Sequence, residues 1–190
     1  MMKRIAWFAI AVLMMMSFVQ TADALVYEFG GGTGFENRGG DIWAGEDNDS
    51  GQDGIYQYDF RPHFAVFLNH NTTLGAYFNL SIEDYSAYNL TEIELGPRIG
   101  YYFTQMGPGY PFVETRVSYG ALLYSNHRFG SFTESHIATE IGGGYLYLLN
   151  QNVGVTGGLY YEQHFYDQFE TGWISGNKFG VQLGIRAFIY

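Results

Sequence analysis

The chain of 190 residues is acidic, with 19 Asp and Glu against 9 Lys and Arg and a formal net charge of −10. This balance argues against a nucleic-acid partner, because proteins that bind nucleic acids present basic patches to the phosphates. Cysteine is absent, which excludes disulfides and thiolate chemistry. Aromatic residues make up 19% of the chain and there are 26 glycines, a composition that favours β-strands joined by tight turns.

The N-terminus has the three parts of a secretory signal peptide. Lys3 and Arg4 form a basic region, Ile5–Val19 is almost unbroken apolar sequence, and Ala22-Asp23-Ala24 offers small residues for cleavage. The apolar run of about 15 residues is shorter than the roughly 20 that a membrane-spanning helix needs, which disfavours an anchor or a buried helix. We therefore predict that residues 1–24 are a signal peptide and that residues 25–190 form one exported domain.

The exported part alternates polar and apolar residues in eight segments. A period of two is that of a β-strand, in which successive side chains lie on opposite faces. Each segment reaches the roughly 9–11 residues that a tilted membrane strand requires. In chain order the predicted strands are Leu25–Phe35, Ile55–Leu68, Thr73–Glu83, Thr91–Thr104, Phe112–Tyr124, His136–Leu149, Val153–Phe165 and Lys178–Tyr190.

The charges of these strands share one face. In Thr91–Thr104, Glu92, Glu94 and Arg98 occupy even positions, and apolar residues occupy most of the odd ones. Because an eight-stranded barrel is just wide enough for its own side chains, we expect such residues to fill the interior as paired ions. A thin path for cations is the alternative. The predicted interior network consists of Asp59, Arg61, Glu92, Glu94, Arg98, Glu114, Arg116, Glu140, Glu162 and Arg186, with Arg98 as a hub beside Glu92 and Glu94.

The connections between the strands alternate in length. Short, uncharged turns at Asn69–Thr72, Gln105–Pro111 and Asn150–Asn152 separate longer, charged loops, the first of them Glu36–Gly54. Short turns on one side and long loops on the other are typical of outer-membrane barrels. Aromatic residues gather near both ends of the strands, as in the girdles that flank a lipid band. We therefore predict an all-β, eight-stranded antiparallel up-and-down transmembrane β-barrel, with a soluble lipocalin-like barrel or β-sandwich as the alternative.

Two prolines fall inside predicted strands. Pro62 and Pro97 each lack the N–H group that a strand donates to its ladder, and a closed barrel has no free edge to accommodate them. We expect a β-bulge at each.

With these features the chain resembles the small eight-stranded outer-membrane barrels of the OmpA/OmpX type over residues 25–190. The stretches Tyr110-Pro-Phe-Val-Glu114 and Gly142-Gly-Gly-Tyr-Leu-Tyr147 read like that family, and the C-terminal aromatics Phe188 and Tyr190 match its assembly signal. The resemblance implies a monomer in the bacterial outer membrane, in contact with lipid and lipopolysaccharide and inserted by the barrel-assembly machinery.

Motifs for catalysis and for metal binding are incomplete. The lipid A deacylase family, also eight-stranded barrels, carries an H-x-S-N pattern, but no serine stands two residues after His164, and Ser125-Asn126-His127 has the reverse order. Asp47, Asp49 and Asp53 are spaced vaguely like a calcium loop, yet Gln52 stands where an EF-hand needs glycine. We therefore predict no catalytic residue, cofactor or metal.

The interpretation is a non-enzymatic barrel with a structural or surface-interaction role. A narrow cation-preferring porin, an apolar-ligand channel and a deacylase-like enzyme are the alternatives.

Overall fold

The computed structural model describes residues 26–40, 56–84, 88–126, 130–168 and 172–190. The predicted signal peptide and the loop aspartates Asp47, Asp49 and Asp53 lie outside these ranges. Within them, no helix is long and apolar enough to cross a membrane. The strands are β1 (Tyr27–Gly40), β2 (Tyr56–Phe60), β3 (His63–Phe67), β4 (Thr72–Asp84), β5 (Tyr88–Tyr102), β6 (Gly109–Asn126), β7 (Gly130–Leu148), β8 (Val153–Gln168) and β9 (Gly172–Ile189).

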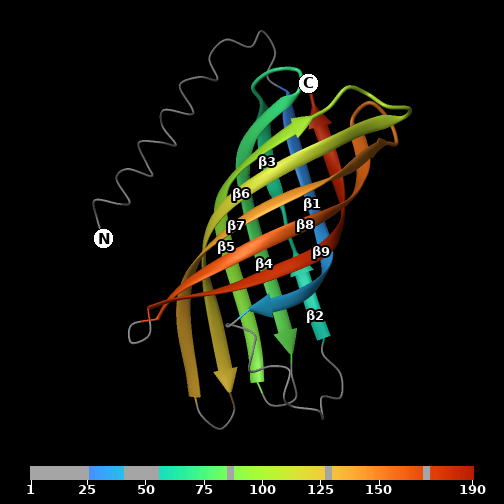
Figure 1. Ribbon diagram of the computed structural model, residues 1–190. Coiled ribbons are helices and arrows are strands. Elements are labelled where there is room, and N and C mark those ends of the chain that lie inside the picture. The colour runs from blue at the N-terminus through green and yellow to red at the C-terminus, as the bar shows by residue number, and fades with distance from the viewer. Residues whose placement is uncertain (1–25, 41–55, 85–87, 127–129, 169–171) are drawn as a thin grey trace.

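The strands form one antiparallel barrel (Figure 1). Each of the strands from β4 to β9 pairs with the next, and β9 pairs with β1 over the whole length of β1, from Tyr27 to Gly40. The short turns and the C-terminus lie at one end, called the turn end below, and the strand ends next to the longer connections lie at the other, the loop end.

Two of the nine strands share one position in the wall. Strands β2 and β3 both pair with β4, and Arg61 and Pro62 separate them. Tyr56 pairs with Asp84 and His63 pairs with Tyr77, so the eight residues from Tyr56 to His63 oppose the eight from Tyr77 to Asp84. The barrel therefore has eight strand positions, and the predicted eight-stranded antiparallel barrel is confirmed.

The expected bulges at the two prolines are wrong. The constant register across Pro62 leaves no extra residue, and the four residues from Leu95 to Arg98 likewise oppose the four from Arg116 to Tyr119. Pro62 interrupts the ladder while its carbonyl still accepts a hydrogen bond from the Phe78 amide at 3.0 Å. A proline removes one donor, and here the strand continues in the same register without it.

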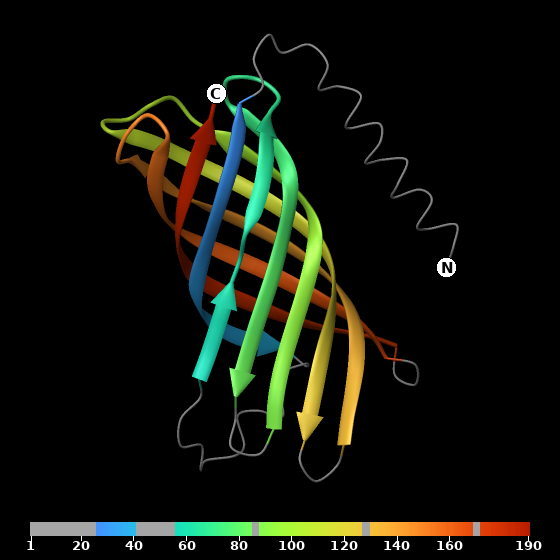
Figure 2. The ribbon, with the colours of Figure 1, turned by 180° about the vertical axis from the view of Figure 1, so that it is seen from behind.

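The wall is weakest between β1 and β2. Strand β1 pairs with β3 only from Tyr27 to Gly30, and beyond Gly30 the ladders of the described residues join β1 to β9 alone. The last backbone contact is a hydrogen bond from the Arg61 amide to the Gly32 carbonyl at 3.1 Å. Figure 2 shows β1 bending away from the line of β2 and β3 in its second half.

Most strands extend further at the loop end than the sequence predicted. Strands β6 and β7 have 18 and 19 residues, beyond the roughly 9–11 that a bilayer requires. An antiparallel ladder satisfies the backbone in water as well as in lipid, so pairing continues past the point where the apolar pattern stops. One consequence is that Glu36, expected in a loop, lies in β1.

The two faces of the wall differ as the alternation predicts. Large apolar side chains are exposed on the outside along every strand from β4 to β9, and aromatic ones occur near both ends. Examples are Tyr101, Phe103 and Tyr147 at the turn end, and Phe35 and Phe165 toward the loop end. An apolar outer surface with aromatic borders fits a lipid band.

Phe188 departs from the expected pattern at the turn-side border. Only 6% of it is exposed, and it lies inside the barrel, whereas the terminal Tyr190 is 74% exposed. Because Ile189 faces outward, its neighbour Phe188 must face inward.

Candidate functional site: the barrel interior

Apolar side chains close the turn end of the interior. Tyr102, Phe112, Leu146 and Phe188 are buried against one another, and Phe67 packs on them with its ring 5.6 Å from that of Tyr102. These residues come from strands on both sides of the barrel, so together they bridge it. We call them the aromatic plug.

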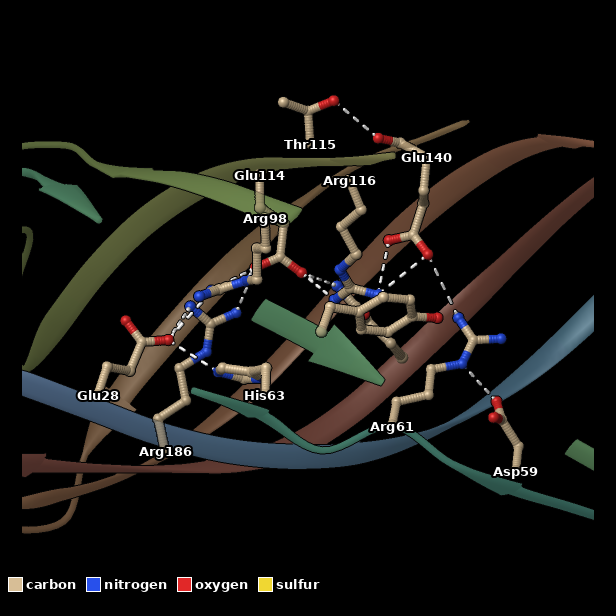
Figure 3. A network of polar contacts seen from close by, with 12 residues as sticks. Glu28, Asp59, Arg61, His63, Arg98, Glu114, Thr115, Arg116, Glu140 and Arg186 are labelled. Carbon is tan, nitrogen blue, oxygen red and sulfur yellow. Dashed lines mark hydrogen bonds and ion pairs between the residues drawn. The ribbon is translucent and has the colours of Figure 1, made fainter. Parts of the chain in front are cut away.

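The first layer of charge above the plug is centred on Glu114 (Figure 3). Arg98 donates two hydrogen bonds to Glu114 Oε2, at 3.0 Å from Nε and 2.6 Å from Nη2. Arg186 Nη2 donates to the same oxygen at 2.9 Å, and Arg116 Nη2 donates to Oε1. One carboxylate thus accepts from three arginines, all of them buried.

Glu28 completes this layer from β1. Its Oε1 lies 3.1 Å from Arg98 Nη2, 3.4 Å from Arg186 Nη1 and 2.8 Å from His63 Nε2. Its Oε2 accepts a hydrogen bond from the Tyr102 hydroxyl at 2.7 Å. The Tyr102 hydroxyl therefore ties the aromatic plug to the charged layer.

A second layer lies between Arg116 and β2. Glu140 accepts a hydrogen bond from Arg116 at 3.0 Å and lies 3.6 Å from Arg61. Arg61 also donates to Asp59 at 2.7 Å and to Glu36 at 3.2 Å. Because Glu36 belongs to β1 and Asp59 to β2, Arg61 links these two strands where their backbones do not pair.

A third group of charged side chains lies inside the barrel on β5, β7, β8 and β9. Glu92 and Glu94 face His136 and His164, and Lys178 donates a hydrogen bond to Glu92 Oε2 at 2.5 Å. All five are buried.

The ten residues predicted for the interior network all lie on the inner face. Nine are buried as whole residues, and the side chain of Asp59 is 2% exposed. Arg98 has the expected position, but it forms ion pairs with Glu28 and Glu114 rather than with Glu92 and Glu94. At about 3.3 Å per residue, Glu94 lies roughly 13 Å along the strand from Arg98, so partners must come from other strands.

The interior network also contains charged and histidine side chains that were not among the ten predicted residues. Glu28, Glu36, His63, His136, His164 and Lys178 all take part in ion pairs or histidine–carboxylate contacts. All except Glu36 stand in the polar register of a predicted strand, so the signal was present. The position of Glu36 could be predicted only if β1 were known to continue beyond the apolar pattern.

No protein-family model matches this sequence, and no curated protein sequence matches it. Solved structures do match. Neisserial surface protein A has a TM-score of 0.64 and 12% sequence identity, over 87% of this chain and 99% of that one. The outer membrane protein AlkL, determined in lipid bilayers, has a TM-score of 0.55 and 12% identity, over 86% and 90%. The resemblance to the small eight-stranded outer-membrane barrels is confirmed at the level of the fold, and the expected outer-membrane location agrees with it.

Proposed function

We propose that this protein is a non-enzymatic barrel of the bacterial outer membrane whose interior is closed to solutes, and that its role is structural or one of surface contact. The observation that carries this proposal is the filled interior. The aromatic plug bridges the turn end, and above it Arg98, Arg186 and Arg116 converge on Glu114. An eight-stranded barrel has no room for a water column beside such side chains.

The length of the strands supports a role at the cell surface. Strands β6 and β7 carry a paired, rigid ladder beyond the length that lipid covers, and they do so at the loop end. In outer-membrane barrels the long loops face the outside, so these strand ends would extend beyond the lipid on the outer side. The protein would reach this place as a monomer inserted by the barrel-assembly machinery.

Planar-bilayer recording tests the closed interior. Purified mature protein is refolded, its folded state is checked by the mobility shift of an unheated gel sample, and the same preparation is added to the bilayer. We expect little or no conductance above that of protein-free membranes. A steady, large, cation-selective current from folded wild-type protein would overturn the proposal in favour of the porin alternative.

One observation favours a second candidate, a passage or binding site for an apolar ligand. The outer wall has a groove where β1 leaves β3, and Phe29, Thr33, Phe60, Leu183 and Ile185 are among its lining residues. It is predominantly apolar, as ligand sites commonly are. Vesicles with the protein would then take up a fluorescent fatty acid faster than vesicles without it. Thr33→Trp, which fills the groove, would abolish the difference, and equal uptake by both kinds of vesicle would reject this candidate.

A further inference from the structure

We propose that Glu92, Glu94, His136 and His164 bind one divalent transition-metal ion inside the barrel, and that zinc fits the site best. The two carboxylates come from β5, and the histidines come from β7 and β8. One ligand atom from each residue lies within 4.8 Å of all the others. The histidine–carboxylate contacts join Glu92 Oε1 and Glu94 Oε1 to His136 Nε2 and His164 Nδ1. All four residues are buried.

The separations between these atoms fit a tetrahedral ion. Zinc–nitrogen and zinc–oxygen bonds of about 2.0–2.2 Å place neighbouring ligand atoms roughly 3.3–3.6 Å apart. Glu92 Oε1 lies 3.5 Å from both His136 Nε2 and His164 Nδ1, and Glu94 Oε1 lies 3.9 Å from His164 Nδ1. His136 Nε2 and Glu94 Oε1 are 2.8 Å apart, so these two atoms must separate by about half an ångström to admit the ion.

Each carboxylate is held so that one oxygen faces the histidines. Glu92 Oε2 accepts a hydrogen bond from Lys178, and Glu94 Oε2 accepts weaker ones from Asn79 at 3.4 Å and Tyr77 at 3.5 Å. Glu92 Oε1, on a residue that is 3% exposed, has no hydrogen-bond partner among the described residues. A buried carboxylate oxygen without a hydrogen bond, aimed at two imidazoles, is a ligand atom in need of a cation.

The histidine rings are oriented by their surroundings. His164 Nε2 lies 3.6 Å from Glu162 Oε2, so that Nδ1 is directed to the proposed ion. Metal-binding histidines commonly direct their second ring nitrogen to a carboxylate in this way. His136 is stacked on Tyr166 with the ring centroids 4.8 Å apart, and its cross-strand neighbour Gly120 leaves room for the ring.

The local charge also favours a bound cation. Glu92, Glu94 and Glu162 against Lys178 leave a formal charge of −2, which one divalent ion cancels. Without compensation, buried charge is costly. Protons on both histidines would balance the same charge, and the experiment separates these two solutions. No spacing in the sequence pointed to this site, because its ligands come from three strands and meet only when the barrel closes.

The test is metal binding by untagged, metal-free mature protein refolded in detergent. Cobalt(II) is the probe, because in a tetrahedral site it gives an intense visible absorption, and zinc(II) is then added as competitor. We expect one cobalt per chain, displaced by one zinc. His164→Gln and Glu92→Gln remove ligands and should abolish the absorption, and Glu162→Gln should weaken binding roughly 10–100-fold, as the loss of a supporting carboxylate does.

Two matched controls are present in the chain. His70→Gln removes an exposed histidine at a short turn, and His63→Gln removes an interior histidine that contacts Glu28; both should bind cobalt as wild type does. The mobility shift of unheated samples shows which variants have folded. Folded wild-type protein that takes up no stoichiometric cobalt or zinc at pH 7 would overturn the proposal and leave a proton-balanced cluster. Binding that survives in folded His164→Gln would overturn it as well.

Discussion

Replacing Arg98 with methionine tests whether buried charges hold this barrel together. Arg98 is 1% exposed and donates two hydrogen bonds to Glu114, and its guanidinium also lies 3.1 Å from Glu28. Methionine has a similar length and fills the space without charge. The carboxylates of Glu28 on β1 and Glu114 on β6 then each lose one ion-pair partner.

The size of the effect follows from the partners that remain. Removing one member of a buried ion pair costs about 3–5 kcal/mol when the other charge is left uncompensated. Here Glu114 keeps Arg186 and Glu28 keeps the Tyr102 hydroxyl, so we expect the lower end, about 3 kcal/mol. This corresponds to a change of roughly 100-fold in the unfolding equilibrium. The free energy of unfolding changes by about 1–3 kcal/mol per molar urea, so the midpoint should fall by roughly 1–3 M.

The assay is urea unfolding in detergent micelles, followed by the loss of the fast-migrating band on unheated gels. Ile99→Met is the matched control, because it introduces the same side chain at the next residue, on the lipid-facing side, where Ile99 is 42% exposed. The control should keep the wild-type midpoint. If Arg98→Met also keeps it, the interior ion pairs contribute nothing to stability and the reasoning is refuted.

Three further predictions concern the wall, the plug and the N-terminus. A Cβ at Gly96 would stand 1.9 Å from the Val117 carbonyl oxygen, so Gly96→Ala should lower the urea midpoint, whereas Gly157→Ala, whose Cβ would meet a single side-chain atom at 3.6 Å, should not. Tyr102→Phe removes the donor to Glu28 Oε2 and should cost about 1–3 kcal/mol in the same assay. N-terminal sequencing of protein from outer-membrane fractions should show cleavage after Ala24, and a retained Met1 would contradict export.

The side of the wall on which the charged residues of the predicted strands lie could be predicted from the sequence alone. Alternation is a local property, since two neighbouring residues in a strand face opposite ways whatever the rest of the fold does. Ile93 and Leu95 are apolar and face outward to the lipid, so Glu92 and Glu94, which alternate with them, face the interior. The eight strand positions followed from the same pattern and from the turns between the segments.

The partners of each charge could not be predicted in this way. Arg98 contacts Glu28, which lies 70 residues earlier, because barrel closure and strand tilt bring β1 opposite β5. The tilt depends on the stagger of all the strands together, and no segment of sequence encodes that stagger by itself. Pro62 is a second example. A proline in a strand suggests a bulge, but the pairing with β4 on both sides of Pro62 keeps the register constant, and this pairing could not be seen from the proline itself.

The glycines of the polar register explain how so narrow a barrel holds such large side chains. In three places a glycine directly faces a ring on the neighbouring strand, and a Cβ built on that glycine would lie less than 3.0 Å from a ring atom. The ring then lies over the glycine backbone, in the space that a facing side chain would otherwise need. The pairs are Gly30 with His63, Gly120 with His136, and Gly180 with Tyr160. A histidine held in this way has a fixed orientation, so the bare backbone opposite it determines which carboxylate the imidazole nitrogen reaches. The interior polar network is thus specified as much by the absence of side chains at these glycines as by the charged residues themselves.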